Sequence, residues 1–69
     1  MTVPQRRVLA AVAEGYMTLR EIARAVRRYP HIVQQVLDAL LRRAYVTPSE
    51  HNGVEVYVVT ERGMRALAR

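Results

Sequence analysis

The spacing of apolar residues changes once along this 69-residue chain, and the change divides it into two differently folded parts. Up to about residue 44, apolar side chains recur every three or four positions, which predicts helices with one buried face. From Tyr45 to Val59, β-branched residues and tyrosine dominate, interrupted by Asn52-Gly53. Asn-Gly between two such runs is the strongest short-range signal of a β-hairpin. The sequence therefore predicts an α+β, mostly α domain in which a hairpin follows three helices.

Threonine residues predict where the helices begin. Thr2 and Thr18 are each followed three positions later by Gln or Glu, which is the spacing of a capping box. Thr60 precedes a last short segment in which Met64 and Leu67 are expected to face the core. We predict helices over residues 3–14, 19–27, 30–43 and 61–69, and strands over 45–50 and 54–59.

A chain of 69 residues forms one domain at most, so we expect a single domain over residues 1–69. Because the chain contains no cysteine, disulfides and thiolate metal sites are excluded. The two histidines, His31 and His51, are too few and too far apart to form a zinc site. The chain has no glycine-rich phosphate loop and no nucleophile beside a base, so we expect no enzymatic activity, no metal and no cofactor.

All eleven basic residues are arginines, set against six acidic residues, and the formal net charge is +5 at pH 7. A small domain this basic most often binds a polyanion, either nucleic acid or an anionic membrane. Arginine suits phosphate because its planar fork can bond two oxygens at once. No apolar run approaches the roughly 20 residues of a membrane span, and residues 1–7 lack the apolar core of a signal peptide. We therefore expect a cytoplasmic protein with no membrane partner.

Arginines gather on one flank of the predicted second helix. At 100° per residue, they lie opposite the apolar stripe of Leu19, Ile22 and Val26. The arginine flank consists of Arg20, Arg24, Arg27 and Arg28. A solvated surface is the alternative interpretation, but four arginines with a single nearby glutamate favour a surface that faces an anion.

The predicted third helix combines an apolar face with a polar arc that carries few charges. Val33, Leu37 and Leu40 lie on the apolar face. The opposite arc of about 100° holds His31, Gln34, Gln35, Asp38 and Arg42. Because glutamine can bond the N6/N7 edge of adenine in the major groove, this arc predicts a base-reading surface. A plain solvent-exposed face is the alternative.

The order of two helices, a short turn, a third helix and a hairpin resembles the winged helix-turn-helix domains of MarR-like, ArsR-like and PadR-like transcriptional regulators. Four segments carry the resemblance in the right order: residues 18–23 at the start of the second helix, 30–40 in the recognition helix, 42–46 after it, and 56–63 from the second strand into the last helix. The resemblance covers nearly the whole chain. It implies a three-helix bundle with a β-hairpin wing and a short C-terminal helix.

The resemblance further implies a small, nucleoid-associated transcriptional regulator that binds double-stranded DNA sequence-specifically, with its third helix in the major groove. The base-reading candidates are His31, Gln34, Gln35 and Asp38. The phosphate-binding candidates are Arg20, Arg24, Arg27, Arg28, Arg42 and Arg43. The wing candidates are His51, Asn52 and Gly53. Related repressors dimerise, and we expect a homodimer whose contact comes from the row of Val54, Val56 and Val58, the first helix or the last helix.

Departures from the family pattern carry expectations of their own, and one of them is Tyr29 in place of a good N-cap before the third helix. Gln34-Gln35 stands where Ser-Arg is common, so the arginine that would read guanine is missing. Ala44 replaces the usual glycine after the third helix, which predicts a strained or differently shaped turn. The segment 50–55 contains no arginine, so we do not expect this wing to enter the minor groove.

Two other functions are open at this point. Winged-helix domains also serve as protein-interaction adaptors in transcription and replication machinery, and a wing without arginine favours that alternative. The same basic surface would also accept structured RNA. The high arginine content favours DNA over an adaptor, and no small-molecule site is evident in the sequence.

Overall fold

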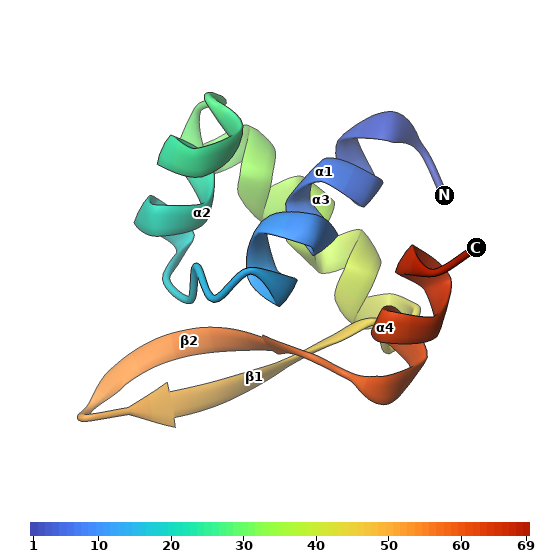
Figure 1. Ribbon diagram of the computed structural model, residues 1–69. Coiled ribbons are helices and arrows are strands. Elements are labelled where there is room, and N and C mark those ends of the chain that lie inside the picture. Colours follow the sequence, from blue (N-terminus) through green and yellow to red (C-terminus); the bar gives the residue numbers. More distant parts are fainter.

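The computed structural model describes all residues 1–69. Three helices, α1 (Val3–Ala13), α2 (Leu19–Val26) and α3 (Pro30–Arg42), pack together, and an antiparallel hairpin and a fourth helix follow them (Figure 1). The predicted α+β, mostly α architecture is confirmed. None of the helices has the length and hydropathy of a membrane-spanning segment.

Both predicted capping boxes are present. Thr2 Oγ1 accepts a hydrogen bond from the backbone N–H of Gln5 at 3.2 Å, and Gln5 Oε1 accepts one from the N–H of Thr2 at 3.0 Å. Thr18 and Glu21 repeat the arrangement at 3.1 and 3.0 Å. Because these bonds satisfy N–H groups that a helix start leaves without partners, the starts of α1 and α2 agree with the prediction.

The ends of the helices depart from the prediction by about one residue. α2 ends at Val26 rather than at residue 27, because Arg27 adopts the left-handed conformation with a φ of 58°. α3 ends at Arg42, and Ala44 is left-handed with a φ of 60°. A left-handed residue with a Cβ is strained, so the predicted strained turn at Ala44 is confirmed.

Strands β1 (Val46–His51) and β2 (Val54–Val59) form a hairpin that projects away from the helices (Figure 1). Its two-residue turn, Asn52-Gly53, has positive φ angles at both positions, as a type I′ turn requires. β1 begins one residue later than predicted, because the N–H of Tyr45 donates to the carbonyl of Leu40 and closes the end of α3.

The last helix, α4 (Glu61–Leu67), is shorter than predicted and turns a different face inward. Gly63 and Ala66 are buried, whereas Met64 is 50% exposed, so its predicted inward position is wrong. A Cβ at Gly63 would collide with the backbone carbonyl of Tyr45. Glycine therefore lets α4 approach the connection between α3 and β1 and sets which face of α4 is buried. Leu67 packs against the core as predicted.

One apolar core joins the helices to the hairpin. Its centre consists of the fully buried side chains of Leu9, Ile22, Leu37 and Leu40. The hairpin and α4 contribute Val46, Tyr57 and Ala66. The N–H of Tyr57 also donates to the carbonyl of Met17, ahead of α2, at 2.9 Å. These contacts hold the base of the hairpin against the helices.

Candidate nucleic-acid interface

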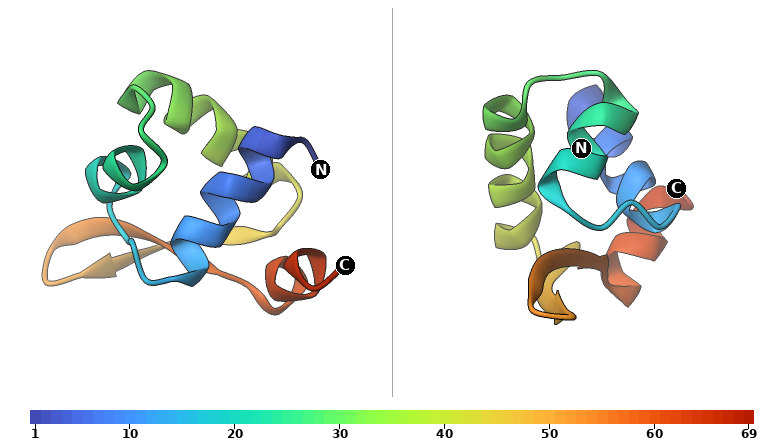
Figure 2. Two further views of the ribbon diagram at one scale, coloured as in Figure 1. Left: turned by 45° about the horizontal axis from the view of Figure 1, so that its top comes forward. Right: turned by 90° about the vertical axis from the view of Figure 1, so that its left-hand side faces the viewer.

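The outer face of α3 is polar and exposed. On the opposite face, Val33, Leu37 and Leu40 anchor the helix in the core with 1% exposure or less. The exposed polar side chains of the outer face are His31, Gln35, Asp38 and Arg42. Figure 2 shows α3 along one edge of the molecule, with α4 on the other side. The polar arc predicted from the sequence is therefore available to a partner, with one exception.

The exception is Gln34, which lies on the hairpin side of α3 and is only partly exposed. Its Nε2 donates to Asp38 Oδ1 at 3.0 Å and to the hydroxyl oxygen of Tyr57 at 3.2 Å. The Tyr57 hydroxyl also donates to Gln34 Oε1 at 3.5 Å, so the side-chain amide of Gln34 is engaged within the chain by both Asp38 and Tyr57. Gln35, the next residue, is exposed. The two adjacent glutamines therefore have different surroundings.

Only two of the four arginines predicted on one helical flank lie within the helix. Arg20 and Arg24 are exposed on α2 as predicted, whereas Arg27 and Arg28 lie beyond the end of that helix. All four nevertheless line one broad open groove between α2 and the first turn of α3, together with Tyr29. Because the N-terminus of a helix also attracts anions, this groove is a strongly electropositive part of the surface.

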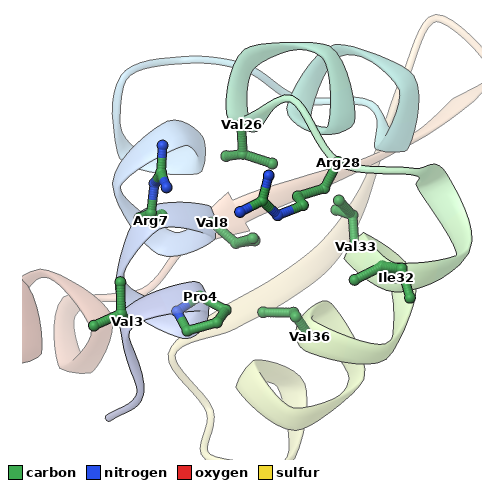
Figure 3. Close-up of a pocket in the computed structure, with 9 residues that line it drawn as sticks. All are labelled: Val3, Pro4, Arg7, Val8, Val26, Arg28, Ile32, Val33 and Val36. Atoms are coloured by element: carbon green, nitrogen blue, oxygen red, sulfur yellow. The ribbon is translucent and has the colours of Figure 1, made fainter.

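The guanidinium of Arg28 extends from this groove over an apolar hollow of about 130 Å³ between α1, α2 and α3 (Figure 3). In that view it points between Val26 and Val8, and its Nη1 donates to the carbonyl of Arg27 at 3.2 Å. Arg7 lies at the rim of the same hollow. Sequence reasoning missed this hollow because its walls come from three separate helices.

Arg42 and Arg43 separate at the end of α3. Arg42 belongs to the exposed outer face, whereas the guanidinium carbon of Arg43 lies 5.9 Å from the centre of the Tyr45 ring. That of Arg62, in α4, lies 5.8 Å from the same ring. Both distances are within the range of a cation–π contact. Sequence reasoning missed Arg62; the available signal was the helical spacing of the arginines in the last helix.

The tip of the hairpin is narrow and acidic. His51, Asn52 and Gly53 are exposed at the turn. One pair further from the turn than His51 and Val54, Glu50 and Glu55 face each other across the two strands, and both are exposed. Like charges in this position weaken strand pairing and repel phosphate.

The carboxylate of Glu21 accepts hydrogen bonds from the backbone at the start of α2. Hydrogen bonds from the backbone N–H groups of Thr18 and Met17 hold the pKa of its carboxyl below the usual value. Because these are capping contacts at the start of α2, the shift has a structural cause. No group of three histidine, aspartate or glutamate side chains could hold a metal ion.

No protein-family model matches the sequence, and no curated protein sequence matches it significantly. Solved structures do match. ZitR from Lactococcus lactis superposes with a TM-score of 0.91 at 22% identity, over 99% of this chain and 49% of that one. A MarR family protein from Bacillus stearothermophilus superposes with a TM-score of 0.90 at 20% identity, over 99% and 49% of the two chains. BpsR from Bordetella bronchiseptica, whose DNA binding is regulated by 6-hydroxynicotinic acid, superposes with a TM-score of 0.88 at 20% identity, over 99% of this chain and 51% of that one.

The chain has the winged helix-turn-helix fold. The fold predicted from the order of the elements is confirmed: α2 and α3 form the helix-turn-helix, and β1 and β2 form the wing. The chain spans about half the length of these solved structures. In this winged helix-turn-helix, the exposed face of α3 and the arginine groove of α2 lie next to each other, and the acidic wing tip projects beside them.

Proposed function

We propose that the chain binds double-stranded DNA as a transcriptional regulator, rather than acting as an enzyme, and inserts α3 into the major groove. The exposed polar face of α3 carries this proposal, because it adjoins the four-arginine groove and contains a single carboxylate, Asp38. The major groove is wide enough to admit a helix, and the arginines would contact phosphates on its walls. BpsR, which shares the fold, is a DNA-binding protein, and this supports the proposal.

Within this proposal, Gln35 and Asp38 read bases directly and Gln34 positions Asp38. A glutamine amide can bond adenine N6 and N7, and a carboxylate can accept from cytosine N4. Gln34 is assigned this positioning role because its amide is already bonded to both Asp38 and Tyr57. His31, near the N-terminal end of the same face, is proposed as a further base contact.

Phosphate binding is assigned to the arginines that flank this face. Arg20, Arg24, Arg27 and Arg42 are exposed and free of side-chain hydrogen bonds. Arg28 and Arg43 would join them after leaving the apolar hollow and the Tyr45 ring. The wing turn of His51, Asn52 and Gly53 stays outside the minor groove, because the adjacent carboxylates repel phosphate.

A test of base reading begins with the selection of a preferred site from random duplexes. Gln35→Ala is expected to cost about 1–3 kcal/mol of binding free energy on that site and little on random DNA. Tyr57→Phe keeps the buried ring and removes the hydroxyl, so it is expected to weaken discrimination only at the base pair that Asp38 reads. Equal losses on both DNAs for Gln35→Ala would mean that α3 is not the reader.

Phosphate binding is tested by the dependence of affinity on salt. Arg20→Ala and Arg24→Ala are each expected to weaken binding to all sequences alike and to lower the salt slope by about one counterion. Arg65→Ala, on α4, removes the same charge away from α3 and serves as the control. An unchanged salt slope in the double variant Arg20→Ala/Arg24→Ala would show that these arginines lie outside the interface. Tighter binding to a double-stranded RNA than to DNA would favour the RNA alternative. Absence of binding to any duplex would favour the protein-adaptor alternative.

We further propose that the regulator acts as a homodimer, because one recognition helix covers only a few base pairs. Two-fold pairing would place two α3 helices about 34 Å apart in successive major grooves. Apolar side chains available for such a contact on the three predicted surfaces are Val3 in α1, Met64 in α4, and Val54 and Val58 in the hairpin, which are 39–72% exposed. Val56, in the middle of the predicted valine row, is buried and does not contribute. Sedimentation that shows only a 7.9 kDa species at micromolar concentration, with and without DNA, would contradict the dimer.

A further inference from the structure

An acidic pair of side chains lies near the tip of the wing, and a group of arginines lies at its base. Neither group is neutralised by opposite charges within the chain. At the tip, Glu50 and Glu55 face each other across the strands. At the base, four arginines surround Tyr45; this set, called here the Tyr45 cluster, consists of Tyr45, Arg43, Arg62, Arg65 and Arg69. The chain has one salt bridge, between Arg65 and Glu61.

The Tyr45 cluster concentrates positive charge around a shallow hollow. The guanidinium carbons of Arg43 and Arg62 lie 5.9 and 5.8 Å from the centre of the Tyr45 ring. Tyr45, two arginines of α4 and the C-terminal Arg69 line a hollow of about 190 Å³ beside Ala66. Glu61, which bonds Arg65 at 3.1 Å, is the one carboxylate paired with the cluster. The remaining positive charge would be stabilised by a carboxylate pair seated in the hollow.

The wing tip is complementary to this hollow in charge. It is a two-residue turn that projects from the body of the molecule (Figure 1), and its two carboxylates lie side by side on one face. Their mutual repulsion weakens the strand pairing and would be relieved by guanidinium groups. The tip cannot fold back onto its own cluster, because five residues of strand hold Glu50 about 16 Å from Tyr45.

We propose that the wing tip of one copy docks on the Tyr45 cluster of a second copy, with Glu50 and Glu55 accepting hydrogen bonds from its arginines. The contact joins two different surfaces, so it is heterologous and can repeat from copy to copy into an open array. It differs from a two-fold pairing, which uses the same surface on both copies. The docking contact does not depend on DNA. The docking proposal can therefore be wrong while the proposed DNA binding is right, and the DNA-binding proposal can be wrong while docking is right.

Charge reversal of each surface tests the contact by sedimentation velocity over a range of protein concentrations. The wild-type chain is expected to form species that grow beyond a dimer and that dissociate as salt is added. Glu50→Arg/Glu55→Arg and Arg62→Glu/Arg69→Glu are each expected to lose all species larger than a two-fold pair. Glu50→Gln/Glu55→Gln, which adds no positive charge, is expected to show the same loss. Arg20→Glu/Arg24→Glu, on α2, is the matched control and is expected to assemble as the wild type does.

An equimolar mixture of the two reversed variants is the decisive sample. Arg62→Glu/Arg69→Glu leaves Arg43 and Arg65 against two new carboxylates and Glu61, so its cluster is negative overall and attracts the basic tip of the other variant. The acidic tip of the same variant meets the unchanged cluster on the other. The larger species are therefore expected to return, and their return also shows that both variants are folded. A wild-type chain that never exceeds a dimer would overturn the proposal, as would large species that persist in both reversed variants. If Arg62→Glu/Arg69→Glu weakens duplex binding but leaves sedimentation unchanged, the cluster binds nucleic acid and the docking proposal is wrong.

Discussion

Replacement of Ala44 by glycine is expected to stabilise the fold. The left-handed conformation at Ala44, with a φ of 60°, costs an L-residue about 1–2 kcal/mol and glycine almost nothing. Glycine also makes the unfolded chain more flexible, which offsets about 0.4–1 kcal/mol of that gain. The free energy of unfolding is therefore expected to rise by about 0.5–1 kcal/mol.

The surrounding hydrogen bonds explain why the glycine variant would keep the same conformation. The N–H of Ala44 donates to the carbonyl of Leu41 at 3.0 Å, and the carbonyl of Ala44 accepts from Thr60 Oγ1 at 2.6 Å. Both bonds use the backbone of residue 44, so neither depends on its side chain. Strain relief is thus the only large change that the substitution makes in the folded state.

Thermal unfolding followed by circular dichroism measures this effect. In a domain of this size, 1 kcal/mol shifts the melting temperature by roughly 4–8 °C, so a rise of a few degrees is expected. Ala25→Gly makes the same chemical change at an exposed position inside α2 and is expected to cost about 1 kcal/mol through lost helix propensity. If both variants melt at a lower temperature by similar amounts, strain at Ala44 does not limit stability and the reasoning is wrong.

Two further substitutions test packing and charge. Gly63→Ala is expected to lower the free energy of unfolding by about 1–2 kcal/mol in urea titrations, because the new Cβ collides with the carbonyl of Tyr45. This loss is expected although alanine has the better helix propensity. A neutral or stabilising effect would show that α4 can move away. The lowered pKa of Glu21, caused by the N–H groups of Thr18 and Met17, adds stability above the unfolded pKa of about 4.3, and this stability is lost as the pH falls through the folded value. Unfolding measured from neutral to acidic pH is therefore expected to show a shallower acid-side decline in Glu21→Gln, and an identical decline would exclude this contribution.

The sequence alone determined the features that depend on local interactions. Both capping boxes join residues three positions apart, such as Thr2 with Gln5. The type I′ turn at Asn52-Gly53 depends on which residues tolerate a positive φ. The burial of Val33, Leu37 and Leu40 follows from helical spacing within α3. Each signal is contained in a short stretch of chain, so the element order and the winged fold could be predicted from it.

The tertiary structure alone decided which polar groups of the interface are free. Gln34 and Gln35 are identical neighbours on the predicted arc, yet Tyr57, 23 residues further along the chain, bonds only Gln34. In the same way, the carbonyl of Tyr45 admits only a glycine beside it and so turns Met64 outward. Helical spacing gives the direction of a side chain around its own axis, but its partners come from other elements, and their positions are set by the packing of the whole core.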